Sequence, residues 1–349
     1  MAAEHFRTWG DLSLSSVGLG TYLGDDDDAT DALYRAAIIR ALELGVNVLD
    51  SAINYRHQRS ERTIGEALRA LIGRGVLKRE EVLVATKGGF IPFDGTLPVN
   101  RSAYLLETYI HPGILEPEEI VAGCHAMTPR YLMDQIERSR KNLGLETIDV
   151  YYLHNPETQL GEVSRTEFLR RIRSAFETLE RACAAGAMRW YGTATWNGYR
   201  QPPEARDSLA LEELVTVARD VAGEEHHFCF VQLPFNLAMP EAFTLRNQPL
   251  GRERVSLLEA ASHFGIYVMA AASVYQGQLA RRLPPMVGEC LAGLETHAQR
   301  ALQFVRSTPG VGTALVGMKL IAHVEENLRV ARVPPARQED YLRLYQRIS

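Results

Sequence analysis

The sequence has few of the features that mark secreted and membrane proteins. Its 349 residues include four cysteines, which lie far apart and form no C-x-x-C pair. This spacing argues against a disulfide framework and favours reduced thiols. No apolar run approaches the length of a membrane span, and the first residues lack the apolar core of a signal peptide. The sequence therefore predicts a cytoplasmic protein.

An excess of one charge is also missing. The formal net charge is -5, and the 38 lysines and arginines are scattered along the chain. Nucleic acid or an anionic membrane surface would call for a clustered basic patch, so we expect neither as a partner. Hydrophobic residues make up 46% of the chain, which is enough for a sizeable buried core. The sequence leaves the oligomeric state open.

Apolar segments typical of buried strands alternate with amphipathic helical segments along nearly the whole chain. The predicted strands cover residues 17–20, 46–50, 82–86, 148–153, 188–192, 228–233, 266–270 and 313–317. The predicted helices cover residues 30–44, 60–72, 129–143, 166–185, 207–221, 255–264, 295–307 and 321–331. Eight such units favour an α/β fold with a single (β/α)8 TIM barrel over a doubly wound sheet. No linker divides residues 1–349, so we expect one barrel domain.

Three segments fall outside this alternation. Residues 6–15 alternate around Gly10 and Asp11, which predicts a hairpin before the barrel. Residues 336–348 have helical spacing and predict an added helix on the barrel exterior. Residues 88–127 form an insertion after the third strand, rich in proline, glycine and aromatic residues. Loops this long are uncommon unless functional, so the insertion is either a lid over the barrel mouth or a packed subdomain or oligomer contact.

The predicted strands end in residues that suit acid–base chemistry. Catalytic groups of a barrel gather at the carboxyl ends of its strands, where this sequence has Asp50, Lys87 and His154, with Tyr55 on the loop after the second strand. Alone, each has an ordinary structural role. Together they supply a proton donor, whose pKa the neighbouring ammonium would lower, and a histidine that can bind a substrate oxygen. Such a site suits the addition of hydride from a cofactor to a carbonyl group.

The motifs around these residues resemble those of the aldo-keto reductase family, in the same order and over residues 17–328. They are Val17-Gly-Leu-Gly-Thr21, Asp50-Ser-Ala-Ile-Asn-Tyr55 with Ser60-Glu61, Ala85-Thr-Lys87, Leu153-His154-Asn-Pro156, and Gly317 with Glu326-Asn327. The resemblance implies that Tyr55 is the general acid, that Lys87 and Asp50 tune it, and that His154 orients the carbonyl. It also implies a nicotinamide cofactor, NADPH rather than NADH, held on a barrel, in keeping with the lack of a G-x-G-x-x-G motif after the first strand.

The resemblance extends to a set of cofactor contacts. These are Asn155, Thr195, Gln232, Ser273, Val274, Gly277, Leu279, Gly317, Lys319, His323, Glu326 and Asn327. Residues 273–279 look like the segment that holds the pyrophosphate, because backbone N–H groups near a glycine can approach a phosphate closely. Lys319 would meet a 2'-phosphate, and Glu326 and Asn327 would contact the adenine.

Two departures from the family pattern lie near the expected nicotinamide position. The usual Ser-Asn pair is Ala194-Thr195, and Ala271 stands where an aromatic residue usually stacks, so that Tyr275 or Trp196 would have to replace it. These changes leave open a catalytically silent sensor or interaction protein that only binds the cofactor. A cofactor-free lyase or isomerase with Lys87 as a Schiff base is a third hypothesis, which the neighbouring acid weakens because it keeps the amine charged.

The sequence also predicts which side chains line the substrate pocket and whether a metal is bound. The expected lining residues are Tyr22, Phe90, Asn155, Trp196 and Phe235. Three sets of possible metal ligands occur, namely the aspartates at residues 25–28, Cys124 and His125 with His111, and His226 with His227. The aspartates are typical of a solvated loop at a helix start, and the other sets lack recognisable ligand spacing. We therefore expect a small carbonyl compound as the substrate and no metal.

Overall fold

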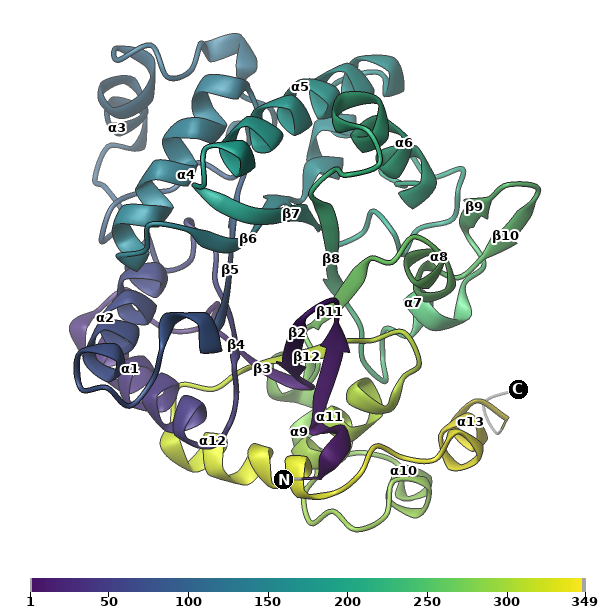
Figure 1. The fold of residues 1–349 in the computed structure, drawn as a ribbon. Helices are drawn as coiled ribbons and strands as arrows, with labels where there is room; N and C mark the ends of the chain where they lie inside the picture. Colours follow the sequence, from purple (N-terminus) through teal and green to yellow (C-terminus); the bar gives the residue numbers. More distant parts are fainter. Residues whose placement is uncertain (1, 347–349) are drawn as a thin grey trace.

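The computed structural model describes residues 2–346, and its centre is a closed barrel of parallel strands (Figure 1). The hydrogen-bonded order is β11-β12-β3-β4-β5-β6-β7-β8. The strands are β3 (Val17–Gly20), β4 (Val48–Asp50), β5 (Leu83–Gly88), β6 (Ile148–His154), β7 (Met188–Ala194), β8 (Phe228–Pro234), β11 (Tyr267–Ala271) and β12 (Thr313–Gly317). The predicted barrel is therefore confirmed, with each strand close to its expected place.

The helices form a ring outside the strands (Figure 1). They are α1 (Asp28–Glu43), α2 (Arg59–Gly73), α4 (Pro129–Leu143), α5 (Arg165–Ala184), α6 (Leu211–Ala222), α8 (Leu257–His263), α11 (His297–Ser307) and α12 (Ile321–Asn327). Helix α6 begins later than residue 207, because the side chain of Gln248 accepts the N–H of Leu211 at 2.9 Å and so caps the helix there. No helix within residues 2–346 has the length and apolarity needed to cross a membrane.

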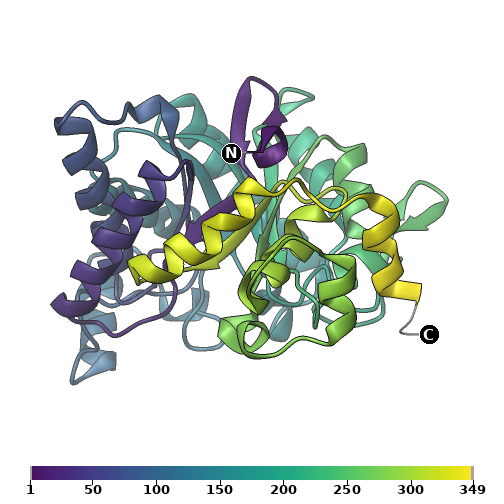
Figure 2. The same cartoon turned by 90° about the horizontal axis from the view of Figure 1, so that it is seen from below.

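The predicted hairpin and terminal helix are both present. Strands β1 (Phe6–Trp9) and β2 (Leu12–Ser15) pair antiparallel and project beyond one end of the barrel (Figure 2). Trp9 packs edge-on against Trp190 and Phe230, which lie near the starts of β7 and β8, so the hairpin closes the amino end of the barrel. Helix α13 (Gln338–Gln346) packs on the outside, where Tyr341 stacks against Phe304. The expected last helical residues, 347 and 348, lie outside the described chain.

The insertion packs as a small subdomain beside α4, away from the centre of the barrel (Figure 1). It contains α3 (Arg101–Leu105) and a π-helical turn over Leu106–Ile110. Its own apolar cluster includes Tyr109, Leu115 and Ala126, together with Tyr131 of α4. These contacts agree with the packed alternative, since the segment has a buried apolar cluster of its own, although Leu97, Val99 and Leu106 are exposed.

Candidate active site

The centre of the site is a buried ion pair at the carboxyl ends of β4 and β5. Lys87 is 1% exposed, and its Nζ donates to both carboxylate oxygens of Asp50 at 2.8 and 2.7 Å and to the carbonyl of Ser51 at 2.6 Å. Three acceptors need three N–H groups, so the side chain is a charged ammonium. Burial lowers the pKa of Lys87, and the carboxylate of Asp50 opposes that shift. An ammonium with all its hydrogens bonded is a poor nucleophile, which argues against Schiff-base chemistry.

A second polar group fixes the carboxylate from the far side of the barrel. Nε2 of Gln232, near the end of β8, donates to Oδ1 of Asp50 at 2.7 Å. The buried carboxylate therefore has both a cation and an amide as partners, as a buried charge requires. Gln232 was expected among the cofactor contacts, and the structure places its amide in contact with the carboxylate of Asp50.

Tyr55 lies against this ion pair. Nζ of Lys87 is 5.0 Å from the centre of the Tyr55 ring, and the rings of Tyr22 and His154 pack edge-on against it at 4.9 and 5.8 Å. Burial raises the pKa of Tyr55 well above its ordinary value, and the charge of Asp50 adds to the shift. The prediction that Lys87 lowers this pKa is wrong for the structure described, because burial outweighs an ammonium whose charge Asp50 already balances. Tyr55 is therefore a neutral phenol, which is the form a proton donor requires.

His154 ends strand β6 and presents a neutral imidazole to Tyr55. Burial lowers the pKa of His154 well below its ordinary value, and the positive charge of Lys87 adds to the effect. The ring of Phe90 packs edge-on against the imidazole at 5.0 Å. A neutral imidazole carries one N–H and can donate one hydrogen bond to a substrate oxygen. The three strand-end residues Asp50, Lys87 and His154 thus meet at one place with Tyr55, as the sequence predicted.

A cavity of about 510 Å³ opens beside Tyr55. Thirteen of its lining residues were expected from the sequence, namely Tyr22, Asp50, Tyr55, Trp196, Gln232, Ser273, Val274, Gly277, Gly317, Lys319, His323, Glu326 and Asn327. The sequence did not indicate that Leu23, Tyr34 and Ala298 also line it. Tyr55 and most of the residues expected to contact the cofactor therefore share one cavity.

Some of the predicted lining residues lie elsewhere. Phe235 is 1% exposed and stacks against Phe304 of α11, so its assignment to the substrate pocket is wrong. The cause is strand alternation, since Gln232 points into the barrel and the third residue after it faces the helices. Phe90 contacts the rings of His154 and His125 and does not line the cavity.

Three expected cofactor contacts also lie off the cavity wall. Leu279 packs against the main apolar core. Asn155 takes a left-handed conformation, with φ of 46°, where its N–H bonds to the carbonyl of Ala194 at 2.6 Å. Thr195 is buried, and its hydroxyl has no hydrogen-bond partner among the described residues. The structure thus leaves these three without direct contact to the main cavity.

Trp196 and Tyr275 were the aromatic residues expected to replace the one missing at Ala271, and Trp196 is the one that lines the cavity. Trp196 and Ala271 line the same cavity, and Tyr275 does not. The loop that carries Trp196 is held by Glu157, whose Oε1 accepts the backbone N–H groups of Trp196 and Asn197 at 2.8 and 3.1 Å. Sequence reasoning missed Glu157, although this acid directly follows the His154-Asn-Pro156 motif.

Some residues that line the cavity have polar atoms without a hydrogen-bond partner in the described chain. Within residues 2–346, Lys319 makes no hydrogen bond or ion pair, and the buried Oδ1 of Asn327 has no hydrogen-bond partner. An unpaired cation and an unpaired buried amide oxygen on one cavity wall are suited to a ligand with a phosphate and a hydrogen-bond donor. These groups fit the phosphate and the adenine of a dinucleotide.

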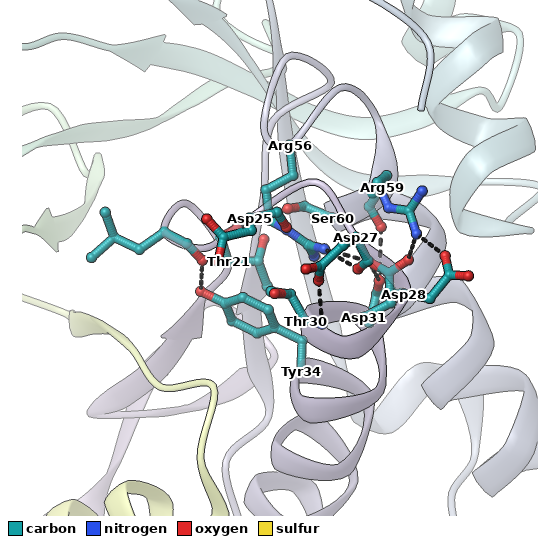
Figure 3. Close-up of polar contacts among 12 residues, drawn as sticks. Thr21, Asp25, Asp27, Asp28, Thr30, Asp31, Tyr34, Arg56, Arg59 and Ser60 are labelled. Atoms are coloured by element: carbon teal, nitrogen blue, oxygen red, sulfur yellow. Dashed lines mark hydrogen bonds and ion pairs between the residues drawn. The ribbon is translucent and has the colours of Figure 1, made fainter. Parts of the chain in front are cut away.

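The aspartates at residues 25–28 bind the protein itself (Figure 3). Asp27 caps α1 by accepting the N–H of Thr30 at 2.7 Å, and Arg59 pairs with both Asp28 and Asp31. The guanidinium of Arg56 donates to the carbonyl of Asp25 at 2.7 Å and pairs with Asp31 at 2.5 Å. The carboxylates of Asp27 and Asp28 thus have ordinary partners, and Asp25 is held through its backbone carbonyl. No cluster of three or more histidine, cysteine or acidic side chains suited to a metal occurs in the part of the chain that the structure describes.

Arg56 also begins an unusual turn. Arg56, His57 and Gln58 are successive non-glycine residues with positive φ, at 47°, 53° and 72°. Left-handed conformations cost roughly 1–2 kcal/mol each, so other contacts must hold the turn. The buried guanidinium of Arg56 supplies them by joining the turn after Tyr55 to the loop after β3. No sequence pattern indicated this connection beyond the position of Arg56 beside Tyr55.

Comparison with known proteins identifies the family. Residues 16–286 match the model of the aldo/keto reductase family, so the chain belongs to that family and the resemblance seen in the sequence is confirmed. An aldo-keto reductase of Klebsiella pneumoniae in complex with NADPH has a similar structure, with a TM-score of 0.65 and 20% identity over 99% of this chain and 95% of that one. This likeness supports the barrel fold.

Curated relatives match over shorter segments. Prostaglandin F synthase 1 of Bos taurus is 24% identical over 140 residues, which are 40% of this chain and 31% of the relative. NADH-specific methylglyoxal reductase of Escherichia coli is 26% identical over 149 residues, which are 41% of this chain and 39% of the relative. The matches thus span well under half the length of these relatives.

Proposed function

We propose that this protein reduces an aldehyde or ketone with NADPH. The observation that carries the proposal is the ion pair of Lys87 and Asp50, which lies against the neutral phenol of Tyr55 at the edge of the cavity. A neutral His154 lies beside the same phenol. The set contains a proton donor and a donor for the carbonyl oxygen, which are the two groups that carbonyl reduction requires of the protein.

The chain's own residues handle the proton. When bound, NADPH supplies the hydride to the carbonyl carbon. Tyr55 donates its proton to the oxygen, which becomes basic as the carbonyl is reduced. The Lys87 ammonium then stabilises the phenolate that remains, because an opposite charge nearby favours the charged form. The neutral imidazole of His154 donates a hydrogen bond to the same oxygen and so orients the carbonyl.

We propose that Lys319 and Asn327, the cavity residues that have polar atoms without partners among the described residues, form part of the cofactor site. Lys319 would bind the 2'-phosphate, and His323 lies on the same wall. Asn327 and Glu326 would contact the adenine, and residues 273–277 would hold the pyrophosphate with backbone N–H groups. Lys319 is the reason to prefer NADPH over NADH, since a free cation there has no other partner among the described residues.

The substrate that fits this cavity is uncharged and largely apolar. The rings of Tyr22 and Trp196 line the cavity, and the ring of Tyr22 lies 4.9 Å from that of Tyr55. Among residues 2–346, the cavity is lined by one lysine, Lys319, and by no arginine, and we assign Lys319 and His323 to the cofactor. Aromatic walls favour apolar groups, so we propose aromatic or aliphatic carbonyl compounds without a carboxylate or phosphate.

The test is turnover of NADPH with a panel of carbonyl compounds. Purified protein is mixed with NADPH or NADH and with benzaldehyde, a longer aliphatic aldehyde and a carboxylated aldehyde, and the absorbance of the reduced cofactor is followed. We expect turnover of the uncharged aldehydes with NADPH. Binding of NADPH without turnover of any compound would instead support the silent sensor, and failure to bind either cofactor would contradict both proposals.

A further inference from the structure

The two ends of the insertion meet behind His154. The N–H of Ala126 bonds to the carbonyl of Gly89 at 2.9 Å, and Phe90 and His125 form a β-bridge. Gly89 has φ of 144°, and a Cβ there would lie 2.8 Å from Nε2 of His125 and 2.9 Å from the carbonyl oxygen of His154. Only glycine therefore allows His125 to approach the backbone of His154 so closely.

His125 is held in one tautomer by its neighbours. Its Nε2 lies 2.8 Å from the carbonyl oxygen of His154, and its Nδ1 lies 2.8 Å from the amide nitrogen of Gln159. Arg171 donates to the amide oxygen of Gln159, which fixes the orientation of that amide. Because the amide nitrogen can only donate, Nδ1 of His125 accepts, and the proton lies on Nε2. Nε2 therefore donates to His154.

These contacts matter because the side chain of His154 has little hydrogen-bonded support of its own. Within the described chain its Nδ1 is buried without a hydrogen-bond partner. The imidazole is held instead by the ring of Phe90 on one side and that of Tyr55 on another, and by its own backbone. Both Phe90 and His125 belong to the insertion. The insertion thus supports His154 at its ring and at its carbonyl group.

We propose that His125 is a positioning residue for His154, so that the insertion acts in the reaction from outside the cavity. The inference rests on the proposed carbonyl reduction. The hydrogen bond from Nε2 fixes the end of β6, and the imidazole of His154 then presents its donor at the right distance from the substrate oxygen. Small displacements of a positioned group are known to cost a large part of the rate.

The test compares His125→Phe with His125→Gln. Phenylalanine keeps the ring volume and removes both hydrogen bonds, and the glutamine amide can restore the donor to His154. We expect His125→Phe to lower kcat about tenfold with the Kd of NADPH unchanged, and His125→Gln to recover part of the loss. His5→Phe is the matched control, because His5 is also buried and lies outside the site, bonded to Ser16. It should leave kcat unchanged.

Two results would overturn the inference. One is a kcat of His125→Phe within twofold of the wild type, and the other is an equal loss in cofactor affinity, which would indicate general damage to the fold. If His125→Phe does not fold, Gln159→Leu replaces it, because it removes the donor that fixes the tautomer. A smaller fall in kcat in this variant supports the inference, and an unchanged kcat contradicts it.

A spectroscopic measurement separates this inference from the proposed function. Nitrogen-15 labelled histidines report the tautomer of each ring by NMR, whether or not the protein turns over a carbonyl. We expect an Nε2–H tautomer for His125, and shifted ring signals of His154 in His125→Phe and not in His5→Phe. Absence of turnover in the wild type would contradict the proposed function alone. An Nδ1–H tautomer, or unmoved His154 signals, would contradict the positioning role alone.

Discussion

The two sides of the cavity are built differently. On one side, which we call the clamped side, residues 22–31 and 55–59 are joined by the ion pairs of Arg56 and Arg59 with Asp31 (Figure 3). On the other, which we call the open loop, residues 271–279 make few side-chain hydrogen bonds. There Ala272, Tyr275 and Gln276 have positive φ, and the carbonyl of Ala272 accepts from Asn236 at 3.0 Å.

The difference suits two separate tasks. The clamped side carries Tyr55, whose distance to a substrate oxygen must be fixed for proton transfer. The open loop exposes backbone groups in left-handed turns, and such a segment can adjust to a phosphate group. We therefore expect changes on the clamped side to reduce the rate. Changes in the open loop, or in the other residues that we propose bind the cofactor, should reduce cofactor affinity.

The largest effect is expected from Tyr55→Phe. Loss of the proton donor should lower kcat by about 10²- to 10⁴-fold, the usual contribution of a general acid, with the Kd of NADPH unchanged. Steady-state kinetics and cofactor titration measure the two quantities. Tyr151→Phe is the control, since the Tyr151 hydroxyl is buried with no hydrogen-bond partner in the described chain and lies outside the site. A Tyr55→Phe variant with wild-type turnover would refute the role of Tyr55.

The second effect concerns acid stability at His125, which lies behind His154 and outside both sides of the cavity. Burial lowers the pKa of His125 from 6.5 to about 4. The unfolded chain binds the proton more readily, so the contribution to stability is complete above pH 6.5 and is lost as the pH falls towards 4. The pKa difference corresponds to about 3 kcal/mol in the free energy of unfolding.

Urea unfolding from pH 7 to 4 measures this dependence. His125→Gln should lose less stability than the wild type over that range, because glutamine does not titrate. His111→Gln changes an exposed histidine of the same insertion and should follow the wild type. Equal pH dependence in the wild type and His125→Gln would contradict the assigned pKa.

A smaller effect is expected when the hydrogen bonds of Arg56 on the clamped side are removed. Arg56→Met keeps much of the side-chain volume and removes the hydrogen bonds to Asp25 and Asp31. The expected cost is about 2 kcal/mol in the free energy of unfolding, as for a hydrogen bond to a charged group. The rate should fall while the Kd of NADPH stays the same. A rise in that Kd without a fall in kcat would contradict the expectation that changes on the clamped side reduce the rate and leave cofactor affinity unchanged.

The smallest effect should come from a change at Lys319, which we propose binds the cofactor. Lys319→Met removes the free cation, and we expect the Kd of NADPH to rise about tenfold, or 1.4 kcal/mol, from the loss of a charge-assisted contact. The Kd of NADH should change little, since NADH lacks the 2'-phosphate. Fluorescence titration with both cofactors measures the difference. Equal changes for the two cofactors would show that Lys319 does not bind that phosphate.

The sequence predicted which residues meet at the strand ends better than it predicted the pocket walls. Asp50, Lys87 and His154 lie at the ends of apolar strands, and barrel topology brings strand ends together whatever the loops do. Phe235 was misplaced because one further residue along a strand reverses the face of the side chain. The pKa of Tyr55 was misjudged because burial, which outweighs the nearby ammonium, is set by packing from several loops at once.

What the sequence determined by itself is the alternation of strands and helices and the residues at the strand ends, because local periodicity and composition encode both. Only the tertiary structure decided that Arg56 ties together the loops of the clamped side and that His125 reaches the backbone of His154. These contacts join residues 29 to 31 positions apart in the chain. They depend on how loops fold over the barrel mouth, and no local pattern in the sequence records that geometry.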